Sequence, residues 1–172
     1  MGKVLGIFIC PRAGLLMQSV PRVMAFADLG LEGDRYSLRV GSWSKPGVKA
    51  NRQVSLVAIE DISDANTSLE KGFSPQDTRR NILTEGVELN RMVNIEFLVG
   101  GVLMLGIKQC DPCARPSALV DKPFFAKALA RRGGLIAEVL NDGVIRVGDG
   151  IFAFVEEGRA PMRVYLVKWN RL

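Results

Sequence analysis

The sequence contains no histidine, and this absence excludes several kinds of chemistry. Catalytic arrangements of the Ser-His-Asp and Cys-His types use an imidazole to activate the nucleophile, and the common catalytic zinc sites include histidine ligands. Any chemistry in this chain must therefore depend on cysteine, carboxylate, lysine or arginine side chains, or on a bound cofactor.

Cysteine is also scarce, with three residues among 172, namely Cys10, Cys110 and Cys113. An odd number of cysteines, in a chain that shows no export signal, disfavours a disulfide framework and indicates reduced thiols. The apolar run at residues 1–10 is too short to span a membrane, and no small-residue cleavage site follows it. We therefore expect a cytoplasmic protein that does not associate with membranes.

Acidic residues are outnumbered by basic ones, 18 to 23, which gives a formal net charge of +5. This excess predicts an anionic partner. The basic residues are spread along the chain, and the aromatic residues lie in apolar stretches rather than between basic residues. A surface that stacks nucleic-acid bases combines both residue types in one place. The pattern therefore does not favour nucleic acid as the partner.

Long helical patterns are few, and most of the chain consists of short apolar runs separated by Gly, Pro, Asn and Asp. Such runs are typical of strands, and many short strands favour a barrel or a sandwich. We expect one domain over residues 1–172, with a mostly β, closed or nearly closed barrel of roughly seven to nine strands. The expected strands are residues 4–10, 19–25, 53–59, 95–98, 102–107, 135–140, 144–147, 151–155 and 162–169.

Two turns are expected in the C-terminal third of the chain. Asp142 and Gly143 can adopt the positive φ angles of a tight hairpin between strands 135–140 and 144–147. A second turn, Val-Gly-Asp-Gly at residues 147–150, leads directly into the next apolar run. The C-terminal third is therefore predicted to be a meander.

Three helices are predicted outside the strands. Residues 60–71 show helical spacing of apolar residues and stop at Gly72. A helix of one or two turns is expected to begin at Ser74, which would be the N-cap. A proline follows at the first helical position, and an acidic residue stands at the capping-box position. Residues 123–132 place apolar residues on one face and end at Gly133.

The segment Cys110-Asp111-Pro112-Cys113 is the sharpest local feature. Pro112 stiffens the turn, so Cys113 would be held at a fixed angle on a loop after a strand. A zinc half-site lacks partners, because only Cys10 remains. A dithiol redox pair lacks the βαβ context of thioredoxin-like proteins. Two partly buried structural thiols are the third interpretation, and this segment alone does not decide among them.

A second feature is Thr78-Arg79-Arg80-Asn81. Two adjacent arginines beside an amide could offer several forked donors to a phosphate or carboxylate. The alternative is a solvated face with a surface ion pair.

A third feature is the loop at residues 30–36, Gly-Leu-Glu-Gly-Asp-Arg-Tyr. Two glycines enclosing an acid indicate a tight loop, which Glu32, Asp34 and Arg35 could order through ion pairs. The loop lacks the strand-to-helix context of a dinucleotide-binding or phosphate-binding fingerprint.

Taken in chain order, these segments form a series that resembles the MOSC family, named for the C-terminal domain of molybdenum cofactor sulfurases. No single segment is decisive, but the order and spacing of all of them are specific. The resemblance extends from about Lys3 to Phe154. It is carried by residues 30–36, 52–56, 79–82, 89–92, 111–113, 133–135 and 145–149.

The resemblance implies a Greek-key-rich β barrel with two or three peripheral helices and one functional cysteine, here Cys113. In the cofactor sulfurases this domain is thought to accept sulfur and pass it on, whereas in amidoxime-reducing relatives the thiolate ligates molybdenum. Arg79, Arg80 and Asn81 match the family's Arg-Asn motif and are expected to hold the phosphate of the pterin cofactor. The loop with Glu32 and Asp34 is expected beside the same pocket, where it would contribute to cofactor binding by shaping the site.

The sequence departs from the family's pattern at two places near this cysteine. After Cys113 the chain continues Ala-Arg-Pro-Ser at residues 114–117, where many relatives have a Leu-Glu pair, and Asp111 stands where Glu is common. Both departures bear on the substrate more than on the fold.

The sequence is compatible with three functions. The chain could be a molybdenum enzyme that reduces N-hydroxylated compounds, with electrons from a separate partner, because no flavin, haem or iron-sulfur motif is visible. It could instead carry persulfide sulfur from a cysteine desulfurase on Cys113, or bind the cofactor without turnover. Pyridoxal phosphate is associated with larger family members, and a partner would have to bind it, because no lysine here indicates a Schiff base.

Overall fold

The computed structural model describes residues 2–42, 44 and 52–153. The predicted strand at residues 162–169 lies outside these residues. So do most of residues 41–50, whose Gly, Ser, Pro and Lys content predicts a loop. The elements are β1 (Gly2–Ile9), β2 (Gln18–Val20), β3 (Arg22–Phe26), β4 (Gly30–Leu31), β5 (Val54–Ala58), α1 (Ile59–Asn66), η1 (Gln76–Thr78), β6 (Ile82–Glu85), η2 (Leu89–Met92), β7 (Glu96–Val99), β8 (Val102–Gln109), α2 (Arg115–Val120), α3 (Phe125–Ala128), β9 (Leu135–Val139), β10 (Gly143–Arg146) and β11 (Gly150–Ala153).

Seven strands in the described part of the chain close into a barrel, in the order β1-β11-β7-β8-β9-β5-β6 and back to β1. The β5–β6 pair is parallel, and the other pairs of the ring are antiparallel. A parallel pair needs a crossover connection, and here α1 supplies it. The predicted mostly β barrel is therefore confirmed.

Apolar side chains fill the barrel because the strands alternate between inward and outward residues. In β8, for example, Val102 and Met104 are buried while their neighbours Leu103 and Leu105 are partly exposed. The strands β3, β4 and β10 form a second, three-stranded sheet. Their buried residues belong to the same core cluster, so this small sheet packs against the barrel.

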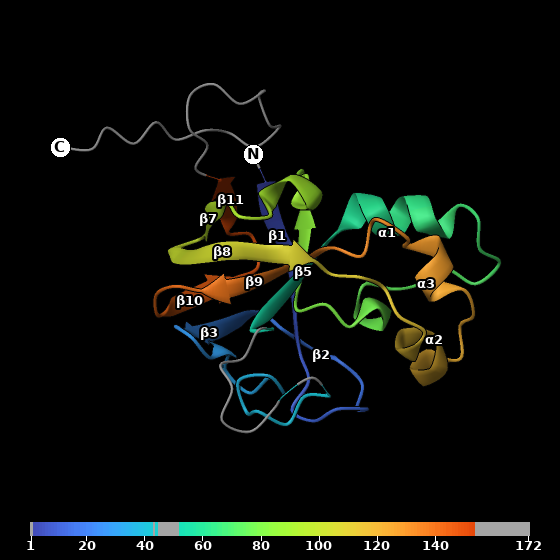
Figure 1. Cartoon of the computed structure of the whole chain (residues 1–172), viewed down its shortest axis with the longest axis horizontal. Coiled ribbons are helices and arrows are strands. Elements are labelled where there is room, and N and C mark those ends of the chain that lie inside the picture. Colours follow the sequence, from blue (N-terminus) through green and yellow to red (C-terminus); the bar gives the residue numbers. More distant parts are fainter. Residues whose placement is uncertain (1, 43, 45–51, 154–172) are drawn as a thin grey trace.

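The three α-helices of the described residues lie together on one side of the barrel (Figure 1). The outer face of the barrel packs against Ile62 of α1 through Phe8, Val57 and Leu83. A separate small cluster joins the helices, and in it the rings of Phe73 and Phe125 meet edge to face with centroids 5.0 Å apart. None of the helices among the described residues is long and apolar enough to cross a membrane.

The predicted hairpin at Asp142 and Gly143 is wrong. β9 pairs with β5 and β8, whereas β10 pairs with β3, so the two strands lie in different sheets. The backbone N–H of Leu103 donates to Asn141 Oδ1 at 2.6 Å, and that of Ala27 donates to Asp142 Oδ1 at 2.7 Å. These bonds hold a crossing between sheets rather than a tight turn, and Gly143 has no positive φ.

The predicted meander is wrong for the same reason, since β11 pairs with β7 and β1 rather than with β10. The second turn itself is present, with Gly148 at a φ of +94°. The C-terminal third therefore supplies strands to both sheets.

Several predicted boundaries also differ from the structure. The strand at 19–25 is divided at Pro21, which has no N–H for a ladder. Helix α1 ends at Asn66, whose side-chain amide bonds both the N–H and the carbonyl of Phe73 and so closes a loop. The third predicted helix is confined to α3, and neither α2 nor β6 was predicted.

Candidate functional site

A concave pocket lies where β1 and β8 end and where β5 and β6 begin. Its volume is about 290 Å³, close to the lower limit of about 300 Å³ for small-molecule sites. Loops far apart in the sequence meet here because the barrel brings these strand ends together. The described residues that line it are Ala13, Arg35, Tyr36, Ser42, Arg52, Val54, Ser55, Arg79, Arg80, Asn81, Cys110, Asp111, Pro112, Cys113, Arg115, Pro116 and Ile136.

Cys113 presents an exposed thiol to this pocket, whereas Cys110 is buried. The segment that carries them begins at a fixed point, because the N–H of Cys110 donates to the carbonyl of Gly134 at 2.8 Å. A Cβ atom at Gly133 would collide with the carbonyl oxygen of Cys110, so only glycine allows this close approach. The third thiol, Cys10, is buried and does not line the pocket.

Arg80 connects the cysteine segment to the start of β6. Its Nε donates to the carbonyl of Gly133 at 2.8 Å, Nη1 donates to that of Thr78 at 3.0 Å, and Nη2 donates to that of Cys110 at 3.3 Å. Its side chain is nearly enclosed, with 7% exposed. Arg80 therefore positions the cysteine segment while its guanidinium lines the pocket.

Arg79 lies beside it in a left-handed conformation with a φ of +59°. Its Nη1 donates to the carbonyl of Leu15 at 2.6 Å, and its Nη2 lies 3.5 Å from Cys10 Sγ. It is 8% exposed. A residue other than glycine is rarely held at positive φ without support from its surroundings, so the side-chain contacts of Arg79 fix this unusual backbone.

No carboxylate of the described residues lies within ion-pair distance of Arg79 or Arg80. Within the described residues, the two guanidinium groups contact only backbone carbonyl oxygens and the sulfur of Cys10. Burying a charge is costly unless an opposite charge compensates it. A guanidinium has five N–H donors, so both side chains keep donors that the described residues do not occupy. The pocket is therefore suited to an anion.

Asn81 and Asp34 are buried, and their polar atoms are occupied by the chain itself. Asn81 Oδ1 accepts from the N–H and hydroxyl of Ser55, and its Nδ2 donates to Phe8 O and to Asp34 Oδ2. The carboxylate of Asp34 also accepts from two backbone N–H groups and forms an ion pair with Arg35 at 3.2 Å. The expected ordering of this loop by an ion pair is thus present.

The structure brings four of the six predicted site residues to one pocket: Cys113, Arg79, Arg80 and Asn81. Asp34 lies behind Asn81 and does not line the pocket, and Glu32 is exposed elsewhere on the loop.

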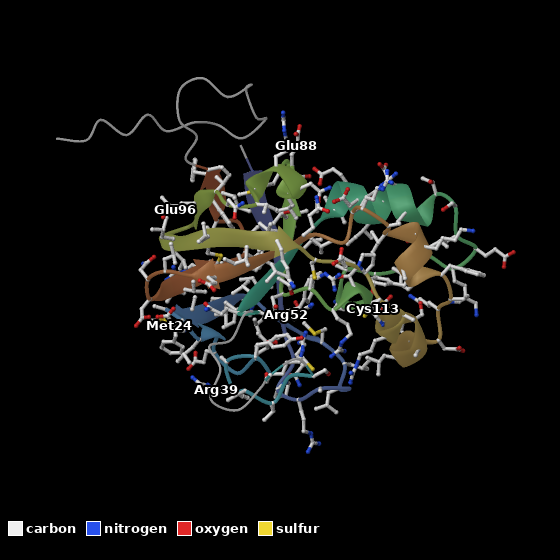
Figure 2. All side chains as sticks on the ribbon, viewed as in Figure 1. Met24, Arg39, Arg52, Glu88, Glu96 and Cys113 are labelled. Atoms are coloured by element: carbon white, nitrogen blue, oxygen red, sulfur yellow. The ribbon has the colours of Figure 1, made fainter. Side chains whose placement is uncertain are left out.

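Three further arginines line the pocket and were not predicted as site residues, namely Arg35, Arg52 and Arg115. Figure 2 shows Cys113 beside α2 and Arg52 near the start of β5. The pocket lining among the described residues includes five arginines and a single carboxylate, Asp111. Arg52 and Arg115 were hard to predict as site residues because each is a single arginine in its own segment.

Helix α2 forms one wall of the pocket and is tied to η1. Lys122, just after α2, donates to Asp77 Oδ2 at 2.7 Å. Burial alone would raise the pKa of Asp77, but the hydrogen bonds from Lys122 and Ser74 outweigh it and lower the pKa below its usual value. The carboxylate therefore stays ionised and holds α2 against the turn that leads to Arg79. No group of three or more Cys, Asp or Glu side chains in the described ranges is arranged to hold a metal ion.

Comparisons with solved structures agree with this architecture. The YUAD protein from Bacillus subtilis is 20% identical, with a TM-score of 0.75 over 88% of this chain and 94% of that chain. YiiM from Geobacillus stearothermophilus is 18% identical, with a TM-score of 0.67 over 92% of this chain and 77% of that chain. YiiM from Escherichia coli is 16% identical, with a TM-score of 0.63 over 94% of this chain and 74% of that chain. At these identities the likeness concerns the fold.

A comparison with curated proteins finds no matching relative. The family model described as "MOSC domain" matches residues 31–152, well over half of the 172 residues. The matched region includes the β barrel strands from β5 to most of β11, the two buried arginines and Cys113. The chain therefore belongs to the MOSC domain family.

Proposed function

We propose that the pocket binds a molybdenum cofactor, with Cys113 as the molybdenum ligand or as a sulfur acceptor. The MOSC family is associated with this cofactor. The observation that carries the proposal is the meeting of an exposed thiol with two buried arginines that lack an acidic partner among the described residues.

The donor set fits the two ends of such a cofactor. A thiolate is a suitable ligand for a soft metal and is also the form that carries a persulfide. Guanidinium groups suit the phosphate at the other end, because they bind its oxygens with paired N–H donors. Arg79 and Arg80 would hold the phosphate, and Asn81 would keep their loop in place through Ser55. When bound, the cofactor would supply the redox chemistry that the protein side chains lack.

Reduction of N-hydroxylated compounds is the activity we favour, with electrons from a separate donor protein. Two alternatives use the same pocket. In the first, Cys113 accepts sulfur as a persulfide from a cysteine desulfurase, which would bind its own pyridoxal phosphate. In the second, the chain holds the cofactor without turnover.

Metal analysis distinguishes the first two functions. The full chain is produced in a host with intact cofactor synthesis, and molybdenum, pterin and thiol-bound sulfur are measured directly after purification. Stoichiometric molybdenum and pterin support cofactor binding over the sulfur carrier. Persulfide on Cys113 without molybdenum supports the sulfur carrier. Absence of all three would refute the proposal.

Replacing Arg80 by alanine is expected to weaken retention of the cofactor phosphate by about 1.5 to 3 kcal/mol, the contribution of a charge-assisted hydrogen bond. The substitution also removes three bonds to backbone carbonyls, so the melting temperature should fall. The measurement is pterin retained per chain, together with the melting temperature, in Arg80→Ala and in the wild type.

The control is Arg132→Ala, which removes an exposed arginine whose ion pair with Asp64 lies outside the pocket. That variant should retain pterin as the wild type does. Unchanged retention in Arg80→Ala with a lowered melting temperature would show that Arg80 only holds the cysteine segment and that the phosphate binds elsewhere.

A further inference from the structure

Arg115 differs from three other arginines that line the pocket, Arg35, Arg79 and Arg80. It lines the pocket two residues after Cys113, and its side chain is exposed. Arg35, Arg79 and Arg80 are buried and bonded to their own chain, whereas Arg115 has no ion pair or side-chain hydrogen bond to any described residue. Its guanidinium is therefore available to a molecule that enters from solvent.

The backbone of Arg115 is nevertheless held in place. Pro116, the next residue, is buried and also lines the pocket. The hydroxyl of Ser117 accepts a hydrogen bond from the N–H of Phe125 at 3.1 Å, and Lys122 is paired with Asp77. These contacts hold α2 in place, so Arg115 presents its charge to the pocket from a fixed backbone position.

Positive charge exceeds negative charge around Arg115. The single carboxylate of the described lining, Asp111, is exposed and does not pair with Arg115. The charge of an exposed arginine is ordinarily solvated by water and contributes little to the stability of the protein. Here it stands close in sequence to the one exposed thiol, inside a pocket where positive charge is in excess. Its field therefore acts on whatever approaches Cys113.

We propose that Arg115 makes the site selective for an anionic reaction partner, so that the molecule brought to Cys113 carries a carboxylate or a phosphate. This inference rests on the proposed function, which places the reaction at Cys113 or at the metal that Cys113 would bind. It concerns the approaching molecule and is separate from the anchoring of a cofactor phosphate by Arg79 and Arg80.

Alkylation of Cys113 tests this selectivity without any cofactor. The full chain is purified from a host that makes no molybdenum cofactor, and its reaction with anionic iodoacetate is compared with that of neutral iodoacetamide. In both reactions the thiolate sulfur forms a bond to carbon and iodide leaves. The ratio of the two rates cancels any change in the amount of thiolate. Buried Cys10 and Cys110 are accounted for with Cys113→Ser.

In Arg115→Gln the ratio of the iodoacetate rate to the iodoacetamide rate should fall about 3- to 10-fold, as expected for losing one nearby charge in a partly solvated site. Arg115→Lys should retain most of the ratio, and salt should lower it in the wild type, because exposed charges are screened. The matched control is Lys127→Gln, which removes an exposed cation of α3 that does not line the pocket.

Inorganic phosphate and acetate, added at equal ionic strength, distinguish the two kinds of anion. Slower iodoacetamide reaction with phosphate supports a phosphate-bearing partner, and slower reaction with acetate supports a carboxylate-bearing one. Equal ratios in wild type and Arg115→Gln, with no protection by either anion, would overturn the inference. If this selectivity is found but the chain from a host with intact cofactor synthesis retains neither molybdenum nor thiol-bound sulfur, the proposed function alone is refuted.

Discussion

Replacing Asp34 by alanine is expected to lower the free energy of unfolding by about 3 to 5 kcal/mol, the usual cost of breaking a buried ion pair. The carboxylate is fully buried, with 0% exposed. It accepts from the backbone of Cys10 and Tyr36 and from the side chains of Arg35 and Asn81. Its loss leaves the guanidinium of Arg35 buried without its acid. Urea denaturation of the purified variant measures the effect.

Glu32→Ala is the matched control, because it removes an exposed acid from the same loop. A surface change of this kind should alter the free energy of unfolding by less than about 0.5 kcal/mol. If Asp34→Ala were as stable as Glu32→Ala but had lost cofactor, Asp34 would be a binding residue rather than a support. The structure favours support, because Asp34 does not line the pocket itself and reaches it only through residues that do, Asn81 and Arg35 among them.

The sequence predicted the fold class because the signals for it are local. Short alternating runs and frequent turn residues identify strands, and six of the seven barrel strands of the described residues were predicted within a few residues of their observed positions. The strand β6 was not predicted, because three of its four residues are buried and no alternation marks it. The partner of β10 is β3, more than a hundred residues earlier, and nothing at Asp142 and Gly143 encodes that pairing.

The candidate site was predictable where its residues are adjacent in sequence. Cys113 stands out beside Pro112, and Arg79 and Arg80 form a pair. Arg52 and Arg115 are single residues in separate segments, and only the closing of the barrel brings them to one pocket. Whether a side chain is buried depends on residues far away in the sequence. The sequence could therefore place Asp34 in this region, but it could not indicate that Asp34 lies behind Asn81 and does not line the pocket.

The hydrogen bonds of Arg80 explain how a buried arginine supports the site. Arg80 bonds the carbonyl of Cys110, and Gly133 allows the close approach that this bond requires. A change at either residue is transmitted to the cysteine segment through the backbone. Cys113 itself is exposed at the end of that segment, so it can be replaced without disturbing the core.

Replacing Cys113 by serine is therefore expected to abolish retention of molybdenum or thiol-bound sulfur while leaving the melting temperature unchanged. Losing an outer-shell partner alone costs about 10- to 100-fold in metal affinity, so loss of the ligand itself should leave no measurable metal. Serine at an exposed position removes no core contact, and the free energy of unfolding should change by less than about 0.5 kcal/mol.

The central claim is tested most directly by measuring molybdenum, pterin and thiol-bound sulfur side by side in the wild type and in Cys113→Ser. Both proteins are produced in a host with intact cofactor synthesis. The account predicts stoichiometric molybdenum with pterin, or persulfide sulfur, in the wild type, and neither molybdenum nor persulfide in the equally stable variant. Equal molybdenum and sulfur contents in the two proteins would contradict it.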